Sequence, residues 1–168
     1  MNTLKAEKRS MDVKAKKLRR EGFVTGNLFG REIEGSIPLK FTKKEIEVLL
    51  KNNNKGSQVM LELDGKTYDA LIKEVDYNPL AHTVEEVDFQ ALVSNEMVHS
   101  TAEIILENEE KVMSGVLQDE LKEVAYKALP ADLVDKIKVD VAGMKIGDTL
   151  RVKDLEIAKN KNIHITTD

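Results

Sequence analysis

The sequence predicts a mainly β protein that contains a few short helices. Apolar and polar residues alternate in short segments along most of the chain, which is the period of half-buried strands. Asp64 and Gly65 lie between two of these segments, 58–63 and 66–76, and Asp-Gly in this position predicts a tight hairpin. Hydrophobic residues make up 41% of the 168 residues, which is enough to form a packed core.

The N-terminal part is expected to combine strands with two helices. Asp12 is the expected N-cap of a helix that continues to about Glu21, because Gly22 follows as a stop signal. A second helix is expected after Thr42, because Thr42 and Glu45 have the spacing of a capping box. The strands of this part are expected over residues 4–6, 23–30, 33–41, 58–63, 66–76 and 83–93.

The C-terminal part continues the strand pattern. No linker rich in Pro, Gly or Ser divides the chain, so a change of charge and rhythm near Ser94 places the boundary there. The sequence therefore predicts two domains, residues 1–93 and 94–168. Pro130 is expected to begin a short helical turn, and strands are expected over residues 98–106, 111–116, 120–128 and 137–141.

Positive charge is concentrated near the N-terminus of an acidic chain. The formal net charge is −4, yet residues 1–20 carry +6, whereas residues 21–90 and 91–168 carry −5 each. The stretch KAKKLRREGF, residues 14–23, has five basic residues in its first seven positions. Such asymmetry predicts a polyanion-binding site at this end of the protein. The plainer alternative is a solvated basic arm without a ligand.

The sequence has none of the patterns that carry catalysis or metal binding. It has no cysteine, and His82, His99 and His164 are too far apart for a metal-binding motif. We therefore expect no enzyme activity, no metal and no cofactor. No apolar run approaches the roughly 18 residues of a membrane-spanning helix, and the first residues lack a signal-type apolar segment. A cytoplasmic protein that is a monomer when free, with no membrane partner, is expected.

Five stretches, in three parts of the chain, carry a family resemblance. AEKR (6–9), AKKLRREG (15–22) and NLFG (27–30) resemble the opening of ribosomal protein L-twenty-five, a large-subunit protein that binds 5S rRNA. LIKEVDYNPLAHTVEEVDF (71–89) resembles the second signature of that family. The stretch from GVLQDEL to RVKDL (115–155) resembles the C-terminal domain of two-domain members, often called Ctc or general stress proteins.

The resemblance implies a fold and a function. It implies an N-terminal closed β-barrel with short helices, followed by a C-terminal β-rich domain of the Ctc type. It also implies a structural protein of the 50S ribosomal subunit that binds the loop E region of 5S rRNA and has a stress-related role. Neighbouring ribosomal proteins would be the partners of the C-terminal domain. Basic positions of the family motif fall on Arg9, Lys16, Lys17 and Arg19, and its acidic position falls on Asp88. With the rest of the basic segment and two further family positions, the predicted RNA-binding residues are Arg9, Lys14, Lys16, Lys17, Arg19, Arg20, Phe29, Glu86 and Asp88.

This chain departs from the family pattern on the side that would face RNA. Phe29 replaces a usual tyrosine, and Glu86 stands where histidine is common. Residues 10–14 lack the usual glycine-flanked loop, and residues 24–26 replace an Ile-Pro-Ala run. A second function class therefore stays open. It is a divergent, non-ribosomal paralogue with the same fold that acts through protein contacts in a stress response.

Overall fold

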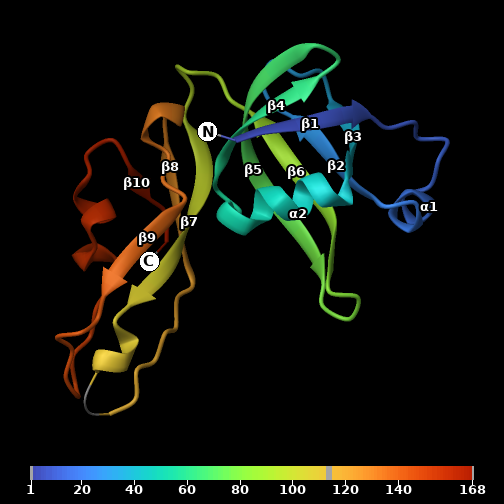
Figure 1. Cartoon of the computed structure of the whole chain (residues 1–168). Helices are drawn as coiled ribbons and strands as arrows, with labels where there is room; N and C mark the ends of the chain where they lie inside the picture. Colours follow the sequence, from blue (N-terminus) through green and yellow to red (C-terminus); the bar gives the residue numbers. More distant parts are fainter. Residues whose placement is uncertain (1, 113–114, 168) are drawn as a thin grey trace. The chain divides into compact units, whose positions relative to one another are not determined.

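The chain folds into two compact units, Met1–Glu96 and Met97–Asp168. The computed structural model describes residues 2–112 and 115–167 (Figure 1). Six strands of the N-terminal unit form a closed barrel, and a four-stranded sheet forms the C-terminal unit. The prediction of a mainly β protein with an N-terminal barrel and a β-rich second part is therefore confirmed.

Two parallel pairings close the barrel. The strand order is β1-β3-β2-β6-β5-β4, and β1 pairs with β4 and β2 with β6 in parallel, whereas the remaining neighbours are antiparallel. A closed sheet leaves no unpaired edge strand. The strands are β1 (Asn2–Lys8), β2 (Phe23–Phe29), β3 (Ser36–Thr42), β4 (Gln58–Leu63), β5 (Lys66–Asn78) and β6 (Thr83–Ala91).

The barrel interior is filled by alternate residues of the strands. Phe41 and Phe89 are both buried, and their ring centroids lie 5.5 Å apart. Gly26 also faces this interior, where a Cβ atom would overlap the carbonyl oxygen of Val87 and lie 3.1 Å from the Phe41 ring. Only glycine therefore permits the close approach of β2 to β6. The other buried members are Leu4, Ala6, Val24, Leu28, Leu39, Ile46, Leu49, Val59, Leu61, Leu63, Ala70, Ile72 and Val87.

The predicted Asp-Gly hairpin is confirmed. Asp64 and Gly65 have φ values of +50° and +78° and join β4 to β5, as a two-residue hairpin turn requires. The β5–β6 connection turns differently. There the side-chain oxygen of Asn78 accepts hydrogen bonds from the backbone N–H groups of Leu80 (3.0 Å) and Ala81 (3.2 Å).

Helix α2 (Lys43–Asn52) begins where the sequence predicts. The Thr42 hydroxyl accepts a hydrogen bond from the Glu45 backbone N–H (3.2 Å) and donates one to the Glu45 carboxylate (2.8 Å). This cap satisfies one of the N–H groups that the first helical turn leaves without a partner. Ile46 and Leu49 are buried in the barrel core, so burial of an apolar face holds this helix.

Helix α1 (Ala15–Arg20) is shorter than expected, and the prediction that Asp12 caps it is wrong. The N-cap is Lys14, which makes no capping hydrogen bond through its side chain. Residues before it form a turn of their own, in which Val13 N–H donates to the Ser10 carbonyl (3.2 Å) and Asp12 N–H to the Ser10 hydroxyl (3.3 Å). This local turn uses the residues that would have begun the helix.

The C-terminal sheet has the order β10-β8-β7-β9, with β7 and β9 parallel. The prediction of a strand over residues 111–116 is wrong in its described part. Lys111 ends a 3-10 helix, and residues 112, 115 and 116 pair with no strand, while 113 and 114 lie outside the described residues. The strands are β7 (Val98–Glu107), β8 (Glu123–Ala128), β9 (Lys136–Asp140) and β10 (His164–Ile165).

Short 3-10 helices connect these strands, and the described residues of this unit contain four of them. The expected helical turn at Pro130 is confirmed as η2. Strand β8 begins at Glu123, three residues later than predicted, because its pairing with β7 starts at the Glu103–Glu123 pair. The 3-10 helices are η1 (Glu109–Lys111), η2 (Pro130–Asp132), η3 (Val152–Asp154) and η4 (Glu156–Lys159).

A buried tyrosine fixes β8 to the segment before β9. The Tyr126 hydroxyl donates to the Val134 carbonyl (2.7 Å) and accepts from the Val134 N–H (2.7 Å). Burial raises the pKa of Tyr126, and the hydrogen bond that its oxygen accepts from the Val134 N–H acts in the opposite direction. One side chain therefore satisfies both backbone groups of a residue outside the sheet.

We expect Gly26→Ala to destabilise the barrel by about 1–3 kcal/mol or more, because the added methyl group overlaps backbone atoms that cannot move independently. Amide hydrogen exchange of β2 and β6 in the full chain would measure the loss. Gly143→Ala is the control, since nothing lies within 4 Å of its added Cβ. Equal exchange in the two variants would contradict this account.

We expect Tyr126→Phe to cost about 1–3 kcal/mol, because both backbone groups of Val134 lose their partner. The change should appear as faster amide exchange in β8 and β9 of the full chain. Tyr77→Phe removes a hydroxyl from a side chain that is half exposed, and it should change exchange little. A Tyr126→Phe variant with exchange like wild type would disprove the role of this hydroxyl.

Candidate nucleic-acid interface

The outer face of the β2–β6 pair brings together residues that are far apart in the sequence. In the parallel register Thr25 lies opposite Glu86, and Asn27 lies opposite Asp88. The alternate residues of both strands are buried in the barrel core, so these four side chains belong to the outer face. Asn27 donates a hydrogen bond to the Asp88 carboxylate (3.3 Å), which joins the two strands across this face.

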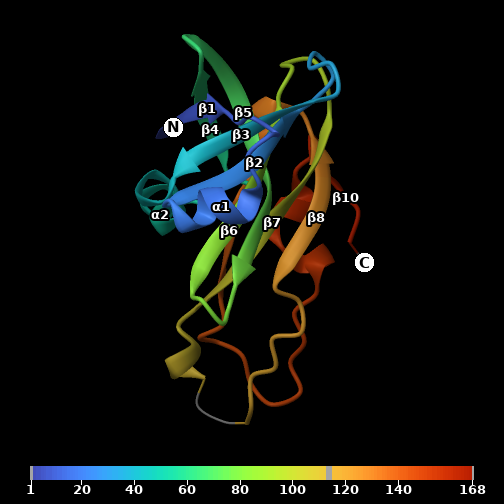
Figure 2. The same cartoon turned by 90° about the vertical axis from the view of Figure 1, so that its right-hand side faces the viewer.

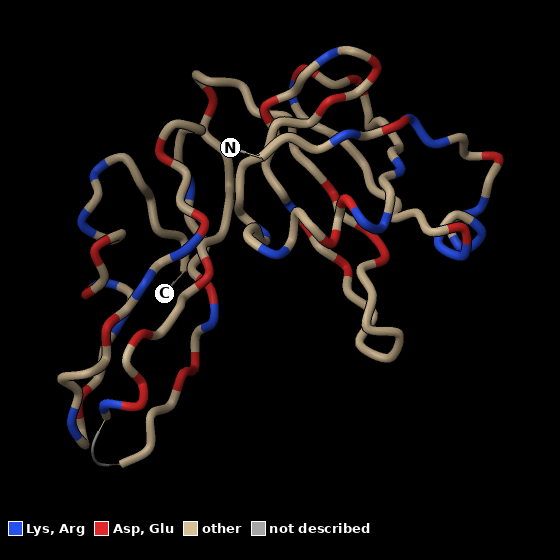
Figure 3. Tube along the Cα trace, viewed as in Figure 1, with Lys and Arg blue, Asp and Glu red and all other residues tan. Residues whose placement is uncertain are grey.

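Helix α1 supplies positive charge next to that face. It packs against β2, and Figure 2 shows it lying on the barrel beside this strand. Figure 3 shows Lys and Arg gathered at and around the helix. We use "α1 cations" for the four exposed basic residues of this helix and its N-cap. None of them pairs with a carboxylate among residues 2–112 and 115–167. They are Lys14, Lys16, Lys17 and Arg20.

The two remaining predicted arginines make contacts within the protein. Arg9 is half-buried after β1, where its Nη2 donates to the Val13 carbonyl (3.4 Å) and its buried Nε has no hydrogen-bond partner. Arg19 is also half-buried. Its Nε donates to the Glu85 carbonyl (3.2 Å) and its Nη2 to the Thr25 hydroxyl (3.3 Å). Both guanidinium groups are therefore directed partly at the protein itself.

Carboxylates form the other half of the face. Asp76 of β5 lies opposite Glu86 of β6, and Asp88 follows two residues later on the same side of the strand. We call Asp76, Glu86 and Asp88 the carboxylate row. Burial raises the pKa of Glu86, and Asp88 and Asp76 raise it further, whereas Arg19 and Arg9 act in the opposite direction. The row thus places like charges side by side and close to two arginines.

Phe29 lies half-buried at the end of β2, opposite Gln90 of β6 and Ser36 of β3. It follows Asn27 on the outer side of the strand, so its ring belongs to the same face as the Asn27–Asp88 pair. Sequence reasoning identified Phe29 but missed Thr25, Asn27 and Asp76. Only the pairing of β2 and β5 with β6 places these three residues on the face, so knowledge of the strand register would have found them.

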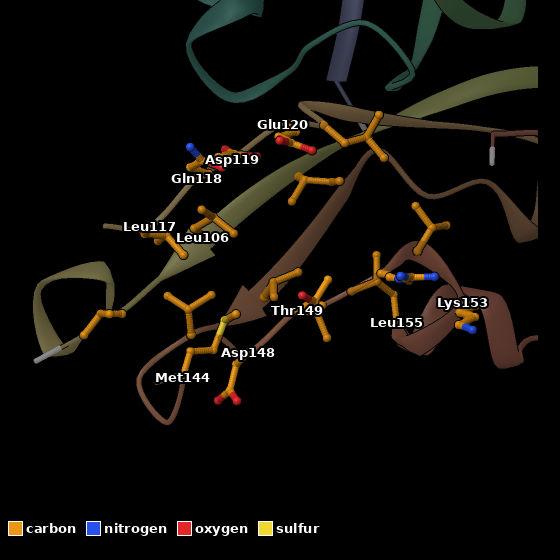
Figure 4. A pocket seen from close by; sticks show the side chains of 18 of the residues that line it. Leu106, Leu117, Gln118, Asp119, Glu120, Met144, Asp148, Thr149, Lys153 and Leu155 are labelled. Atoms are coloured by element: carbon orange, nitrogen blue, oxygen red, sulfur yellow. The ribbon is translucent and has the colours of Figure 1, made fainter. Parts of the chain in front are cut away.

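The C-terminal unit contains a cavity of about 1230 Å³ (Figure 4). Its lining combines apolar side chains such as Leu106, Met144 and Leu155 with charged ones such as Asp119 and Lys153. None of the residues predicted to bind RNA line it. Within residues 2–112 and 115–167, no three His, Cys, Asp or Glu side chains are grouped to hold a metal ion.

The outer face of the β2–β6 pair is suited to contacts with charged and polar groups. The barrel face presents free cations, a carboxylate row and an amide–carboxylate pair, which suit charge-based and hydrogen-bonded recognition. Among the helices of the described residues, none has the length and apolar character to cross a membrane. The fold and the charged face together define a two-unit β protein whose barrel has a charged outer face.

Comparison with known proteins gives the family. The sequence model of the ribosomal L25p family matches residues 4–89, and that of the C-terminal domain of ribosomal protein TL5 matches residues 97–168. The chain belongs to the ribosomal L25p family, in its two-domain form. The family consists of structural proteins and not of enzymes, so the resemblance and the prediction of a non-enzymatic protein are both confirmed.

Relatives match over most of the chain. The large ribosomal subunit protein bL25 of Akkermansia muciniphila is 30% identical over 171 residues, which cover 99% of this chain and 85% of the relative. The protein of the same name from Carboxydothermus hydrogenoformans is 33% identical over 160 residues, covering 90% and 80%. That from Thermoanaerobacter sp. (strain X514) is 29% identical over 151 residues, covering 89% and 75%.

We expect Glu86→Gln to stabilise the full chain at neutral pH. A raised native pKa means that the folded state holds the Glu86 proton more tightly than the unfolded chain does. In wild type, protonation of Glu86 therefore contributes to the free energy of unfolding, and this contribution is complete below the unfolded pKa of glutamic acid, about 4.3. The contribution is lost as the pH rises through the native pKa of Glu86. Glutamine removes this loss because it does not ionise.

Thermal unfolding of wild type and Glu86→Gln at several pH values would measure the effect. The Tm of the variant should exceed that of wild type at neutral pH, and the two should converge in acid. Glu34→Gln, which removes an exposed carboxylate outside the row, is the control for net charge. A Tm difference that is the same at every pH would contradict the assignment.

Proposed function

We propose that this protein is a structural component of the large ribosomal subunit in the cytoplasm, and that its N-terminal domain, residues 1–93, binds the loop E region of 5S rRNA. Membership of a family of ribosomal proteins supports the first part, and the relatives are named as large-subunit proteins. The observation that carries the second part is the position of the free α1 cations beside an outer face with hydrogen-bonding side chains.

The two halves of the face suit the two kinds of contact that RNA offers. Lysine and arginine bind phosphate oxygens and fix the position of the backbone without reading sequence. Carboxylates accept hydrogen bonds from the amino groups of bases, as Asp and Glu do with cytosine. Phe29 offers a ring for stacking against a base or sugar. An internal loop is a suitable target, because its irregular shape exposes base edges that a regular RNA helix hides.

Besides the stacking contact of Phe29, we assign the RNA contacts in three groups. The α1 cations meet phosphates directly, and Arg9 and Arg19 contribute their charge from half-buried positions. Asp88, oriented by Asn27, accepts from a base, and Glu86 lies beside it. The full set is Arg9, Lys14, Lys16, Lys17, Arg19, Arg20, Phe29, Glu86 and Asp88.

The C-terminal domain, residues 94–168, is proposed to contact neighbouring ribosomal proteins. The match of residues 97–168 to the C-terminal domain of ribosomal protein TL5 supports its assignment as a Ctc-type domain. We propose that the free protein is a monomer that needs neither metal nor cofactor.

One observation favours a second function. The carboxylate row places three acidic groups on the face that RNA would approach, and a carboxylate repels phosphate and is costly to desolvate without a partner. A paralogue that acts through protein contacts in a stress response would not approach phosphate, so a carboxylate row on this face would cost it nothing in binding. The two functions differ in whether the protein prefers loop E RNA.

We expect wild type to bind a loop E fragment more tightly than a duplex of equal length, with an affinity that falls steeply with salt. The slope of log K against log[salt] is roughly −0.7 to −0.9 for each phosphate neutralised. Lys16→Gln and Lys17→Gln should each make this slope shallower by about that amount. Gel shifts at several salt concentrations would measure both quantities.

Lys138→Gln, on the exposed side of β9, is the matched control and should leave the slope unchanged. Glu86→His removes a carboxylate two residues from Asp88 on the same face and should tighten binding, most clearly at low salt, where repulsion is least screened. If wild type shows no preference for loop E and Glu86→His restores none, the 5S rRNA proposal fails and the stress-response paralogue takes its place.

A further inference from the structure

Arg19, Thr25 and the backbone of Glu85 form a small hydrogen-bonded group between α1, β2 and β6. The Arg19 guanidinium donates from Nε to the Glu85 carbonyl (3.2 Å) and from Nη2 to the Thr25 hydroxyl (3.3 Å). The Thr25 hydroxyl in turn donates to the same Glu85 carbonyl (3.3 Å). We call these three groups the Arg19 tether. It connects the helix to both strands of the outer face.

The burial of Thr25 indicates that α1 covers this point. Thr25 belongs to the outer side of β2, opposite Glu86, yet its exposed fraction is 0%. The helix packs against β2, and its Leu18 is 4% exposed. A buried hydroxyl needs hydrogen-bond partners, and Arg19 and the Glu85 carbonyl supply them. The hydrogen bond between Arg19 and the Thr25 hydroxyl therefore helps to hold α1 against β2.

Helix α1 has little else to hold it in place. It has six residues, far fewer than the 12–15 or so at which an isolated helix becomes even marginally stable in water, and its N-cap side chain makes no hydrogen bond. Leu18 is its only buried side chain. Lys16 and Arg20 are like charges one turn apart and repel each other. A contact that offsets this repulsion must come from outside the helix.

We propose that Arg19 is a positioning residue, which, through Thr25 and the Glu85 carbonyl, fixes α1 on the barrel so that the α1 cations face a polyanion. This inference rests on the proposed RNA-binding function. Two of the guanidinium nitrogens already donate to the protein. The fixed fork of arginine donates to two acceptors at once, which the single ammonium group of lysine does not reproduce.

The tether predicts a particular kind of effect on binding. A helix that is fixed before RNA arrives loses less conformational freedom on binding, so its affinity is higher without any additional contact. Loss of the tether should weaken binding while the bound complex keeps its phosphate contacts. The salt slope counts those contacts, so it separates a positioning residue from a phosphate ligand.

Thr25→Val is the variant that tests this inference. Valine has nearly the shape of threonine but lacks the hydroxyl, and the positive charge of Arg19 stays in place. Thr25→Ser retains the hydroxyl and is the matched control. The first measurement is amide hydrogen exchange in the free full chain at Glu21 and Gly22, whose N–H groups donate to Lys17 (3.1 Å) and Arg19 (3.2 Å) carbonyls.

We expect exchange at these two amides to be about tenfold faster in Thr25→Val than in wild type, which corresponds to the loss of one hydrogen bond. Exchange in Thr25→Ser should stay close to wild type. Strands β1 and β4 are separated from β2 and β6 by β3 and β5 in the closed strand order. Their amides should be unchanged in both variants, which verifies that the barrel remains folded.

The second measurement is binding to the loop E fragment. Thr25→Val should bind about 3- to 10-fold more weakly than wild type with the same salt slope, whereas Lys16→Gln should make the slope shallower.

Unchanged exchange in Thr25→Val would overturn the tether. Faster exchange with unchanged affinity would overturn its positioning role, and a shallower slope in Thr25→Val would show that Arg19 acts with the phosphate ligands. If wild type itself shows no preference for loop E, the RNA-binding proposal and the positioning role fail together, while the exchange result still decides whether the tether exists.

Discussion

The parallel pairing of β2 with β6 is the contact on which both the barrel and its charged face depend. It closes the sheet between two strands that are separated by most of the N-terminal unit, and it allows an approach so close that only glycine fits at position 26. The same register sets Thr25 opposite Glu86 and Asn27 opposite Asp88. The hydrogen bonds of Thr25 with the Glu85 carbonyl and of Asn27 with Asp88 follow from that alignment, because the register brings these residues together across the two strands.

The elements that were predicted correctly are those fixed by local chemistry. The Asp64–Gly65 turn and the Thr42 cap each depend on a few consecutive residues, so the sequence contains the whole signal. Asp12 failed as a cap because the Ser10 hydroxyl and carbonyl offered a competing turn just before the helix. The strand expected over residues 111–116 failed in its described part because alternation of residue types cannot show whether a partner strand lies alongside.

The sequence predicted those residues of the candidate site that belong to a basic run or to a family motif, and it missed the residues that only cross-strand pairing brings together. The α1 cations are visible in the sequence as a dense basic run, and family resemblance adds Phe29, Glu86 and Asp88. The sequence does not show that Arg19 turns toward the barrel or that Asn27 orients Asp88, because the partners lie about 60 residues away. Asp76 was missed for the same reason. Its relation to Glu86 exists only through the β5–β6 register.

The separation of charge within the N-terminal unit has a consequence for how it meets a large anion. Residues 1–20 carry +6 and residues 21–90 carry −5, and the α1 cations lie together on the barrel surface. An approaching polyanion therefore experiences attraction from one side and repulsion from the rest, and this imbalance rotates the protein during the encounter. A chain with a net negative charge can in this way favour one face for first contact with a polyanion, whereas a uniformly basic protein attracts a polyanion on every side.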